Sequence, residues 1–533
     1  MTPEDWIAHD PDPRTAAELA ACDPGELAAR FARPLAFGTA GLRGPVRGGP
    51  DAMNLAVVLR ATWAVARVLR DLDLAGSAVI VGRDARHGSA VFAIATAEVL
   101  AAEGFSVLLQ PGPVPTPVVA FAVRHTGAAA GIQITASHNP SADNGYKVYF
   151  DGGIQIVPPT DLEIETAMAA APFADQIARK PVEPTDGGLL GRYIERAAAV
   201  RRFTGSVRSV RIALTPLHGV GGAVAVETLR RAGFEHVHTV GAQFAPDPDF
   251  PTVAFPNPQE PGATDALLKL AADVGADVAI ALDPDADRCA VGIPLGISGA
   301  SGWRMLSGDE TGWLLGDYIL SHRLPENPVV ASSVVSSRML AAIAARYGAV
   351  HVETLTGFKW LARADANLPT GTLVYAYEEA IGHCVDPAAV RDKDGISAAV
   401  LVCDLVATLK DQGRSVPEVL DVLARRHGVH EVAAVSRRVA DSGEAAGLLR
   451  RLRDATPDRL AGFAASITDI TDALIFTGGD DDTSVRVVVR PSGTEPKLKY
   501  YLEVRRVVTG DLRPARERAE ALRDELVSEV QRW

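Results

Sequence analysis

The sequence predicts an α/β protein, with three similar α/β domains followed by a smaller α+β domain. Three segments repeat one order of elements: an apolar strand, a Gly/Ser-rich loop, an Ala-rich helix that ends at a glycine, and a second strand. The C-terminal region departs from that order. There, strand-like runs at 484–490 and 499–505 precede a charged amphipathic helix that starts near Pro514.

The three repeats are similar in length and in their helix ends. Their first strands begin at Ser77, Val210 and Pro328, and their helices end at Gly104, Gly233 and Gly348. A glycine suits a helix C-cap, where positive φ is needed. Strand–helix–strand units of this length predict parallel pairing with a right-handed crossover. We expect domains at residues 1–204, 205–303, 304–429 and 430–533.

Composition indicates a cytoplasmic globular enzyme. Of 533 residues, 47% are apolar and 22% charged, and the net charge of −13 argues against nonspecific nucleic-acid binding. Four widely spaced cysteines without a Cys-x-x-Cys motif indicate a reduced protein. The acidic N-terminal segment does not resemble a signal peptide, and without an apolar run of about 18 residues no membrane span is predicted.

The run Gly131-Ile-Gln-Ile-Thr-Ala-Ser137-His138-Asn-Pro140 reads as a strand that ends in a turn. We expect Ser137 to lie on an exposed, constrained loop. A serine hydroxyl becomes reactive only when a neighbour activates it or a group modifies it. Alone, this run favours an ordinary turn that contains a serine and a histidine, and the other motifs of the chain reverse that interpretation.

A second run, Asp283-Pro-Asp285-Ala-Asp287-Arg288, follows the apolar segment 278–282. If the loop is extended, the three carboxylates at alternate positions point the same way. Crowded carboxylates need a cation, and an all-oxygen set suits Mg²⁺. The other reading is a solvated acidic loop.

Further polar runs have the chemistry of phosphate and sugar recognition. The segment from Arg490 to Lys497 places hydroxyls and backbone N–H donors between cations, as in a phosphate-binding nest. Sugar hydroxyls could be recognised by polar groups beside glycines and aromatics, at 37–44, 356–360 and 378–383. Within or near these runs, candidate cations or proton donors are Arg43, Lys147 and His383. The sequence lacks a P-loop, a dinucleotide-binding Gly-x-Gly-x-x-Gly and a Gly-x-Ser-x-Gly hydrolase motif.

These runs, in this order, resemble the motifs of the α-D-phosphohexomutase family over nearly the whole chain. They are 37–44, 135–140, 283–288, 378–383 and 490–497. Two further segments, 215–222 and 250–262, are similar to the branch that includes phosphopentomutases and glucose-1,6-bisphosphate synthases. The resemblance implies three α/β domains with mixed sheets and a smaller fourth domain around a central cleft.

The resemblance also implies roles for individual residues. Ser137 would carry the phosphate and, with Asp283, Asp285 and Asp287, bind Mg²⁺. The residues implied near the reacting groups are His138, Arg43, Lys147 and His383. The residues implied for substrate binding are Thr356, Gly357, Lys359, Glu379, Arg490, Ser492, Gly493, Thr494 and Lys497.

One motif departs from the family. The common form is Gly-Glu-x-Ser-Gly-His, whereas this chain has Glu378 for the first glycine and Ile381 for the serine. The departure leaves the sugar open. We expect a mutase that interconverts hexose 1- and 6-phosphates (mannose or glucose), with a sugar 1,6-bisphosphate as intermediate and activator and sugar phosphates as its small-molecule partners. Alternatives are a phosphopentomutase, a glucose-1,6-bisphosphate synthase, or a catalytically silent sugar-phosphate sensor.

Overall fold

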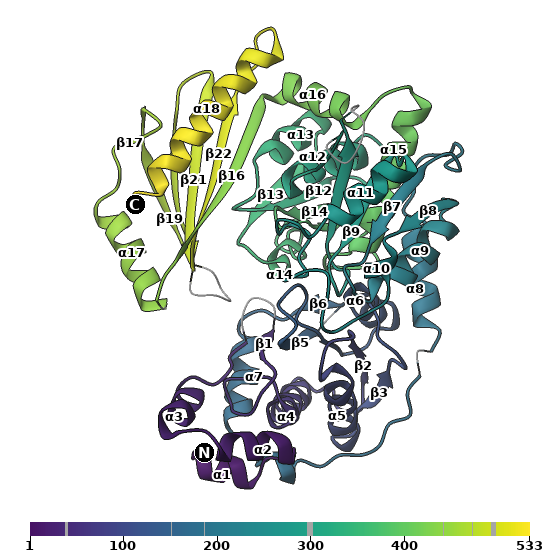
Figure 1. The fold of residues 1–533 in the computed structure, drawn as a ribbon, viewed down its shortest axis with the longest axis vertical. Coiled ribbons are helices and arrows are strands. Elements are labelled where there is room, and N and C mark those ends of the chain that lie inside the picture. Colours follow the sequence, from purple (N-terminus) through teal and green to yellow (C-terminus); the bar gives the residue numbers. More distant parts are fainter. Residues whose placement is uncertain are drawn as a thin grey trace. The chain divides into compact units, whose positions relative to one another are not determined.

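The computed structural model describes residues 1–37, 41–150, 152–185, 187–295, 302–440, 442–471, 473–491 and 497–533. The chain forms two compact units. The first contains Met1–Ser307 and Ala380–Thr408, and the second contains Gly308–Glu379 and Leu409–Trp533. The segment 380–408 therefore belongs to the first unit, although it follows the third repeat in sequence. Figure 1 labels the elements of both units.

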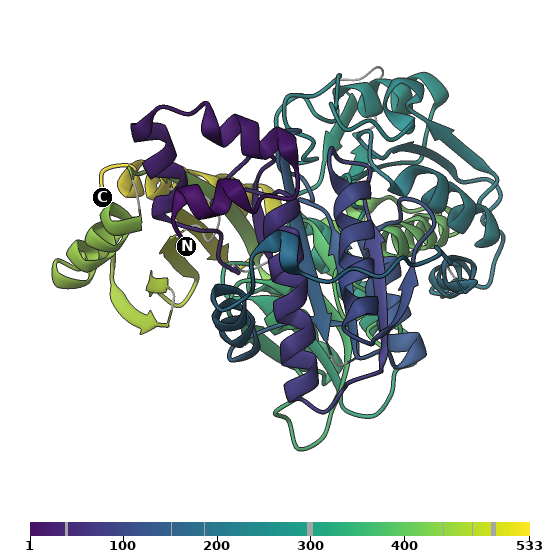
Figure 2. The same cartoon turned by 90° about the horizontal axis from the view of Figure 1, so that it is seen from below.

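The first unit begins with three short helices and the first α/β domain (purple to blue in Figures 1 and 2). Its helical elements are α1 (Pro3–Ala8), α2 (Pro13–Ala20), α3 (Pro24–Ala32), α4 (Leu55–Asp71), α5 (Ser89–Ala102), α6 (Thr116–Thr126), α7 (Thr160–Ala169), the 3₁₀ turn η1 (Ala174–Gln176) and α8 (Leu189–Ala198). Its strands are β1 (Leu42–Pro45), β2 (Ala78–Arg83), β3 (Ser106–Leu109), β4 (Ala130–Ile134), β5 (Asp143–Phe150) and β6 (Ile154–Gln155).

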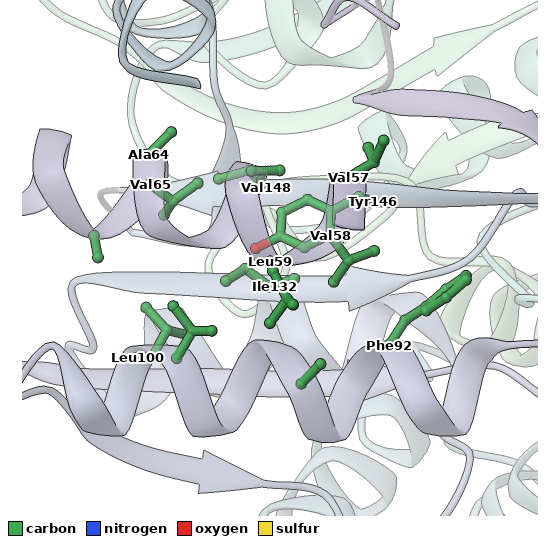
Figure 3. Close-up of a cluster of buried hydrophobic side chains, with 14 of the residues drawn as sticks. Val57, Val58, Leu59, Ala64, Val65, Phe92, Leu100, Ile132, Tyr146 and Val148 are labelled. Carbon is green, nitrogen blue, oxygen red and sulfur yellow. The ribbon is translucent and has the colours of Figure 1, made fainter. Parts of the chain in front are cut away.

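The first sheet is mixed and has the order β1-β5-β4-β2-β3, with β6 paired to β5. Strand β2 pairs in parallel with β3 and β4, whereas β5 pairs antiparallel with β4 and β1. Figure 3 shows Tyr146 of β5 among apolar side chains of α4 and Ile132 of β4, with Phe92 and Leu100 of α5 nearby. The buried Tyr146 hydroxyl lies 2.9 Å from Thr62 Oγ1, so its polar end is satisfied.

The second α/β domain completes the first unit with a smaller sheet. Its elements are β7 (Arg211–Thr215), α9 (Gly221–Arg231), β8 (His236–Thr239), α10 (Gly241–Phe244), α11 (Asp265–Val274), β9 (Val278–Leu282), β10 (Cys289–Pro294) and β11 (Trp303–Met305). The strand order is β11-β10-β9-β7-β8, with β7 parallel to β8 and β9. The two short segments β15 (Gly382–Cys384) and most of α15 (Gly395–Asp411) also belong to this unit.

The second unit contains the third α/β domain and the C-terminal domain. The α/β part has α12 (Gly308–Leu320), β12 (Pro328–Ser333), α13 (Met339–Tyr347), β13 (Val350–Thr354), α14 (Phe358–Leu361), β14 (Thr372–Glu378) and α16 (Val416–His427). The C-terminal part has β16 (Val429–Arg438), α17 (Ser442–Asp454), β17 (Arg459–Leu460), β18 (Phe463–Ala464), β19 (Ser466–Ile470), β20 (Ala473–Gly479), β21 (Thr483–Pro491), β22 (Lys497–Arg506) and α18 (Leu512–Val530).

The predicted fold class is confirmed. Each predicted strand–helix–strand repeat forms a parallel pair, namely β2 with β3, β7 with β8 and β12 with β13. The C-terminal sheet is instead antiparallel, in the order β16-β22-β21-β20-β19, and α18 packs along it (Figure 1). All four cysteines are free thiols. Among the described helices, none is long and apolar enough to cross a membrane.

Within the second unit, Asp309 at the start of α12 is buried and accepts hydrogen bonds from Ser337 N and the Tyr377 hydroxyl, both at 2.8 Å. Burial raises the pKa of Asp309 to about 7. The folded protein therefore keeps a proton that the unfolded chain releases above about pH 4.

Because of Asp309, the free energy of unfolding should decrease as pH rises. Between about pH 4 and pH 7 the unfolded carboxyl ionises while the folded one stays protonated, which lowers the unfolding free energy by at most about 4 kcal/mol. In Asp309→Asn, which keeps the acceptor oxygen, this part of the decrease should disappear. Unfolding midpoints of both proteins from pH 5 to pH 8 measure it, and equal pH slopes would contradict the assignment.

Candidate active site

The predicted serine loop follows β4, but Ser137 is buried rather than exposed. Its residue is 1% exposed, and its φ of 52° lies in the left-handed region. Such a backbone costs about 1–3 kcal/mol in a non-glycine residue and persists only where surrounding contacts hold it. Ser137 N donates to Thr135 Oγ1 at 3.0 Å. The Ser137 hydroxyl donates to Asp283 Oδ2 at 2.8 Å and lies 3.2 Å from His138 Nδ1.

The aspartate run follows β9, and its three carboxylates converge. Asp283, Asp285 and Asp287 are fully buried, and one oxygen of each lies within 4.8 Å of the others. They do not converge because the loop is extended, as the sequence pattern suggested. The loop turns at residues 284–286, and Ala286 has a φ of 56°. The turn brings alternate side chains together without a continuous strand.

Cations partly neutralise this cluster. Lys147 of β5 places its Nζ 2.7 Å from Oδ2 of Asp285 and of Asp287, and Lys393 Nζ lies 3.4 Å from Asp287 Oδ2. Burial alone raises the pKa of Asp287, yet these lysine charges hold it below its ordinary value. Burial and the two neighbouring carboxylates raise the pKa of Asp283 well above its ordinary value. The cluster therefore still lacks positive charge on the Asp283 side.

Two oxygens of the cluster that accept no hydrogen bond from the described residues fit a metal ion; Arg288 Nε lies 3.8 Å from one of them, Asp287 Oδ1. Asp285 Oδ1 and Asp287 Oδ1 are buried without a hydrogen-bond partner in the described part of the chain. A buried carboxylate oxygen without a donor is costly. Hard oxygen donors at this spacing suit Mg²⁺, which also favours phosphate oxygens in its coordination sphere. The three aspartates are thus consistent with a magnesium site beside the Ser137 hydroxyl.

Arg43 and His138 lie beside the serine loop. Arg43 is on β1, opposite Gly145 of β5, and its Nη1 lies 3.4 Å from Asn139 Oδ1. Arg43 Nε is buried without a hydrogen-bond partner in the described ranges, so it can still donate to a ligand. Burial lowers the pKa of His138 well below its ordinary value, so its imidazole is neutral at pH 7.

His383 lies on β15, inside the segment that joins the first unit. It is fully buried, and burial lowers its pKa to about 3. At neutral pH it is therefore an uncharged hydrogen-bonding group rather than a cation. Ile381, two residues earlier, packs with Ala213, Ala279 and other core residues of the second domain. Its side chain is therefore part of that core.

Sequence reasoning missed three groups of the first unit that contact the predicted residues. Thr116, at the start of α6, donates from Oγ1 to Asp285 Oδ2 at 2.5 Å, and Lys393 pairs with Asp287. Arg86 donates to the carbonyl oxygens of the serine loop. The charged run Arg391-Asp-Lys393-Asp-Gly395 before a helix was a visible signal for Lys393. Nothing local marked Thr116 or Arg86.

The remaining predicted residues belong to the second unit. The Glu379 carboxylate accepts hydrogen bonds from Ser333 Oγ at 3.2 Å and Ser336 Oγ at 3.4 Å. Burial, followed by the charge of Glu378, raises the pKa of Glu379.

Of the predicted substrate-binding residues of this unit, Thr356 and Gly357 lie between β13 and α14, Lys359 lies in α14, and Arg490 and Lys497 lie in β21 and β22. Gly357 has a φ of 111°, Thr356 Oγ1 is buried without a hydrogen-bond partner in the described ranges, and Lys359 Nζ lies 5.8 Å from the Trp360 ring centroid. Arg490 ends β21 and Lys497 begins β22, whereas Ser492, Gly493 and Thr494 lie outside the described residues, as do residues 38–40. The structure thus brings seven predicted residues, Ser137 among them, together in the first unit. They are Ser137, His138, Arg43, Lys147, Asp283, Asp285 and Asp287.

Removal of one triad charge should weaken magnesium binding. In Asp285→Asn the amide keeps the hydrogen bonds to Lys147 and Thr116 possible but removes one negative charge, so Mg²⁺ affinity should fall at least about tenfold. Titration calorimetry with Mg²⁺ measures this. The control is Asp277→Asn, a carboxylate at the other end of β9 that accepts from Arg211 N. Equal affinities of Asp285→Asn and wild type would contradict the site.

Comparisons with known proteins identify the family of the chain. Domains I, II and III of the phosphoglucomutase/phosphomannomutase family match residues 34–175, 191–296 and 307–426, and its C-terminal domain matches residues 450–510. A "probable phosphomannomutase" of Haemophilus influenzae is 38% identical over 85% of this chain and 93% of its own length. The phosphopentomutase of Mus musculus is 32% identical over 94% of this chain and 89% of its own length.

A solved structure shows the same fold. The crystal structure of a Thermus thermophilus protein described as a phosphomannomutase has a TM-score of 0.72 and 25% identity, covering 94% of this chain and 99% of that one. Four matched domains in order, with relatives above 30% identity over most of the chain, establish the family. The chain belongs to the α-D-phosphohexomutase superfamily and is a phosphosugar mutase, an intramolecular phosphotransferase.

Proposed function

We propose that this mutase interconverts hexose 1-phosphate and hexose 6-phosphate, with mannose or glucose as the sugar. The phosphate is carried on Ser137, and the sugar 1,6-bisphosphate is the intermediate. The observation that carries this proposal is the 2.8 Å hydrogen bond from the Ser137 hydroxyl to Asp283, at the edge of three converging buried carboxylates. The most similar of the relatives named above, at 38% identity, is named for a hexose phosphate.

In the first half-reaction the bond between phosphorus and Ser137 Oγ breaks, and a bond forms between phosphorus and a hydroxyl oxygen of the sugar. The sugar hydroxyl loses its proton, and Ser137 Oγ gains one. In the free hydroxyl, that proton lies between Asp283 Oδ2 and the neutral His138 ring. His138 Nδ1 is therefore within reach to exchange the proton on Oγ, whereas Asp283, as a magnesium ligand, would stay ionised and only accept the hydrogen bond.

Phosphoryl transfer depends mainly on positioning and on stabilising the charge of the transferred group. Asp283, Asp285 and Asp287, with the phosphate on Ser137, would hold Mg²⁺, which supplies positive charge to phosphate oxygens when bound. Arg43 lies on the same side of the loop, and its unpaired Nε can donate to the phosphate. Lys147 balances the carboxylate oxygens that face away from that position.

Substrate selection is assigned to the second unit. Glu379, held by two serine hydroxyls, is proposed to accept hydrogen bonds from sugar hydroxyls. Arg490, Ser492, Gly493, Thr494 and Lys497 are proposed to bind the phosphate that is not transferred, and Thr356, Gly357 and Lys359 to contact the sugar. His383, which belongs to the first unit, is proposed to act near the reacting groups as a neutral hydrogen-bonding ring.

A pentose substrate, or bisphosphate synthesis, is the second candidate. The observation that favours it is the motif Glu378-Glu-Ala-Ile381-Gly-His383, which lacks the family's serine hydroxyl. Relatives at 31–34% identity are named phosphopentomutase, phosphoribomutase and glucose 1,6-bisphosphate synthase.

Ser137→Ala should lose at least about a thousandfold in turnover, because in this proposal the Ser137 hydroxyl carries the phosphate and alanine has no oxygen to accept it. It should keep binding sugar phosphates. Coupled assays and calorimetry measure the two properties. Ser141→Ala, on the same loop, is the matched control and should keep normal turnover. Turnover by Ser137→Ala close to wild type would exclude a phosphoserine mechanism.

A substrate panel tests the sugar. With glucose 1,6-bisphosphate as activator, kcat/KM for mannose 1-phosphate or glucose 1-phosphate should exceed that for ribose 1-phosphate by at least about tenfold, a difference of about 1.4 kcal/mol. A higher kcat/KM for ribose 1-phosphate would contradict a hexose substrate and identify a pentose-phosphate mutase. Net bisphosphate production from a separate phosphate donor would identify a synthase.

A further inference from the structure

Arg86 lies beneath the serine loop and holds both of its ends. Its Nη2 donates to the carbonyl oxygens of Ser137 at 2.7 Å and Asn139 at 2.6 Å. Its Nη1 donates to the carbonyl oxygens of Pro140 at 2.7 Å and Asp143 at 3.1 Å. One guanidinium thus satisfies four carbonyl groups of a single loop.

This contact set needs an arginine. The planar guanidinium presents donors in a fixed fork, so two nitrogens can each serve two acceptors in different directions. A lysine at this position would supply one ammonium with three donors at a single point. It could hold one end of the loop but would remove a donor from the partly buried carbonyl oxygens at the other end, where Pro140 O would keep only Asp143 N.

Arg86 is itself held from two sides. Asp84 accepts from Arg86 N at 2.9 Å and from Ser89 Oγ at 2.6 Å, and its Oδ2 lies 3.4 Å from Arg86 Nε. On the other side the guanidinium carbon lies 4.9 Å from the ring centroid of Phe250, which comes from the second domain. The Arg86 side chain is 1% exposed. Such packing fixes the guanidinium rather than merely neutralising a charge.

Arg86 bears directly on the strained residue. Ser137 has left-handed backbone geometry, and its carbonyl oxygen is one of the four acceptors. Without that hydrogen bond the residue could relax toward an ordinary conformation, which would turn the side-chain direction. The Ser137 hydroxyl would then lose its 2.8 Å hydrogen bond to Asp283 Oδ2.

We propose that Arg86 is a positioning residue of the phosphoryl transfer. It holds the loop from Ser137 to Asp143 so that the serine oxygen faces the aspartate triad, and Phe250 fastens this arrangement to the domain that carries the triad. The inference rests on the proposed function, in which Ser137 carries the phosphate.

Arg86→Lys tests the geometry of the fork while keeping the positive charge. Its kcat should fall about 100-fold, because a misplacement of about 1 Å at a reacting atom costs about that much. Its KM should stay within about threefold of wild type, since Arg86 does not contact the sugar in this proposal. Phosphorylation of Ser137 by glucose 1,6-bisphosphate, followed by intact mass against time, should slow by a similar factor.

Arg60→Lys is the matched control. Arg60 is another buried arginine of the first domain, and it donates to the carbonyl oxygens of Met168, Ala171 and Pro172 at the end of α7, away from the serine loop. Arg60→Lys should lower the unfolding midpoint but keep kcat. If Arg86→Lys keeps kcat within about threefold of wild type, or if both variants lose kcat equally, the proposal is overturned.

Chemical rescue separates positioning from folding. A recess lined in part by Asp84, Arg86, His218 and Phe250 borders the Arg86 side chain. Millimolar guanidinium should therefore raise the kcat of Arg86→Ala at least about tenfold, and it should leave wild type and Arg60→Ala unchanged. A folded Arg86→Ala that guanidinium does not rescue would contradict the proposal. Retained activity in Ser137→Ala would instead contradict the proposed function itself, whatever the Arg86 variants do.

Discussion

Three buried carboxylates meet at one point of the first unit, and their repulsion governs the site around them. Two unit charges about 4 Å apart interact by about 4 kcal/mol at an effective dielectric constant of 20. One carboxylate oxygen each of Asp283, Asp285 and Asp287 lies within 4.8 Å of the others, and none of the three residues is exposed to solvent. Such a cluster persists only where cations and donors compensate it.

The cations that compensate the three carboxylates approach some of their oxygens and leave others free of hydrogen bonds from the described residues. Those oxygens mark where a metal ion would bind. Lys147 and Lys393 approach the Oδ2 atoms, whereas the Oδ1 atoms of Asp285 and Asp287 have no hydrogen-bond partner in the described part of the chain. The Ser137 hydroxyl meets Asp283 from the first domain. An incoming cation and a phosphate on the serine would therefore complete one charge balance. The hydrogen bond from Ser137 to Asp283 also links the first domain to the second.

Much of the fold was predictable because it follows local patterns. The parallel pairs came from apolar strands and glycine helix ends, and the antiparallel C-terminal strands came from alternating runs. The aspartate run was recognisable because three carboxylates directly follow a buried strand. Its geometry was not predictable, since the turn at Ala286 depends on packing rather than on the side-chain period. The predicted domain boundaries and the roles of individual substrate-binding residues stay predictions.

Contacts between distant segments were beyond sequence reasoning. Ser137 was expected to be exposed because it precedes a turn. The structure buries it against Asp283, which lies 146 residues later in the chain and which no local pattern links to it. Lys393 reaches the site because residues 380–408 join the first unit, and no local signal announces such an excursion. Ile381, which departs from the family's motif, packs in the core of the second domain, and its motif gives no sign of that packing. Arg86 likewise acts on backbone carbonyls, which carry no sequence signature.

We propose that the phosphate on Ser137 and the three aspartates bind one shared metal ion. Mn²⁺ can replace Mg²⁺ as a paramagnetic probe of oxygen ligands. Phosphorus-31 electron–nuclear double resonance on the Mn²⁺-loaded phosphoenzyme should show hyperfine coupling to one phosphate. That coupling should vanish when Ser137 is dephosphorylated. A phosphoenzyme that binds Mn²⁺ at the triad without phosphorus coupling would show that the serine and the aspartates do not form one centre.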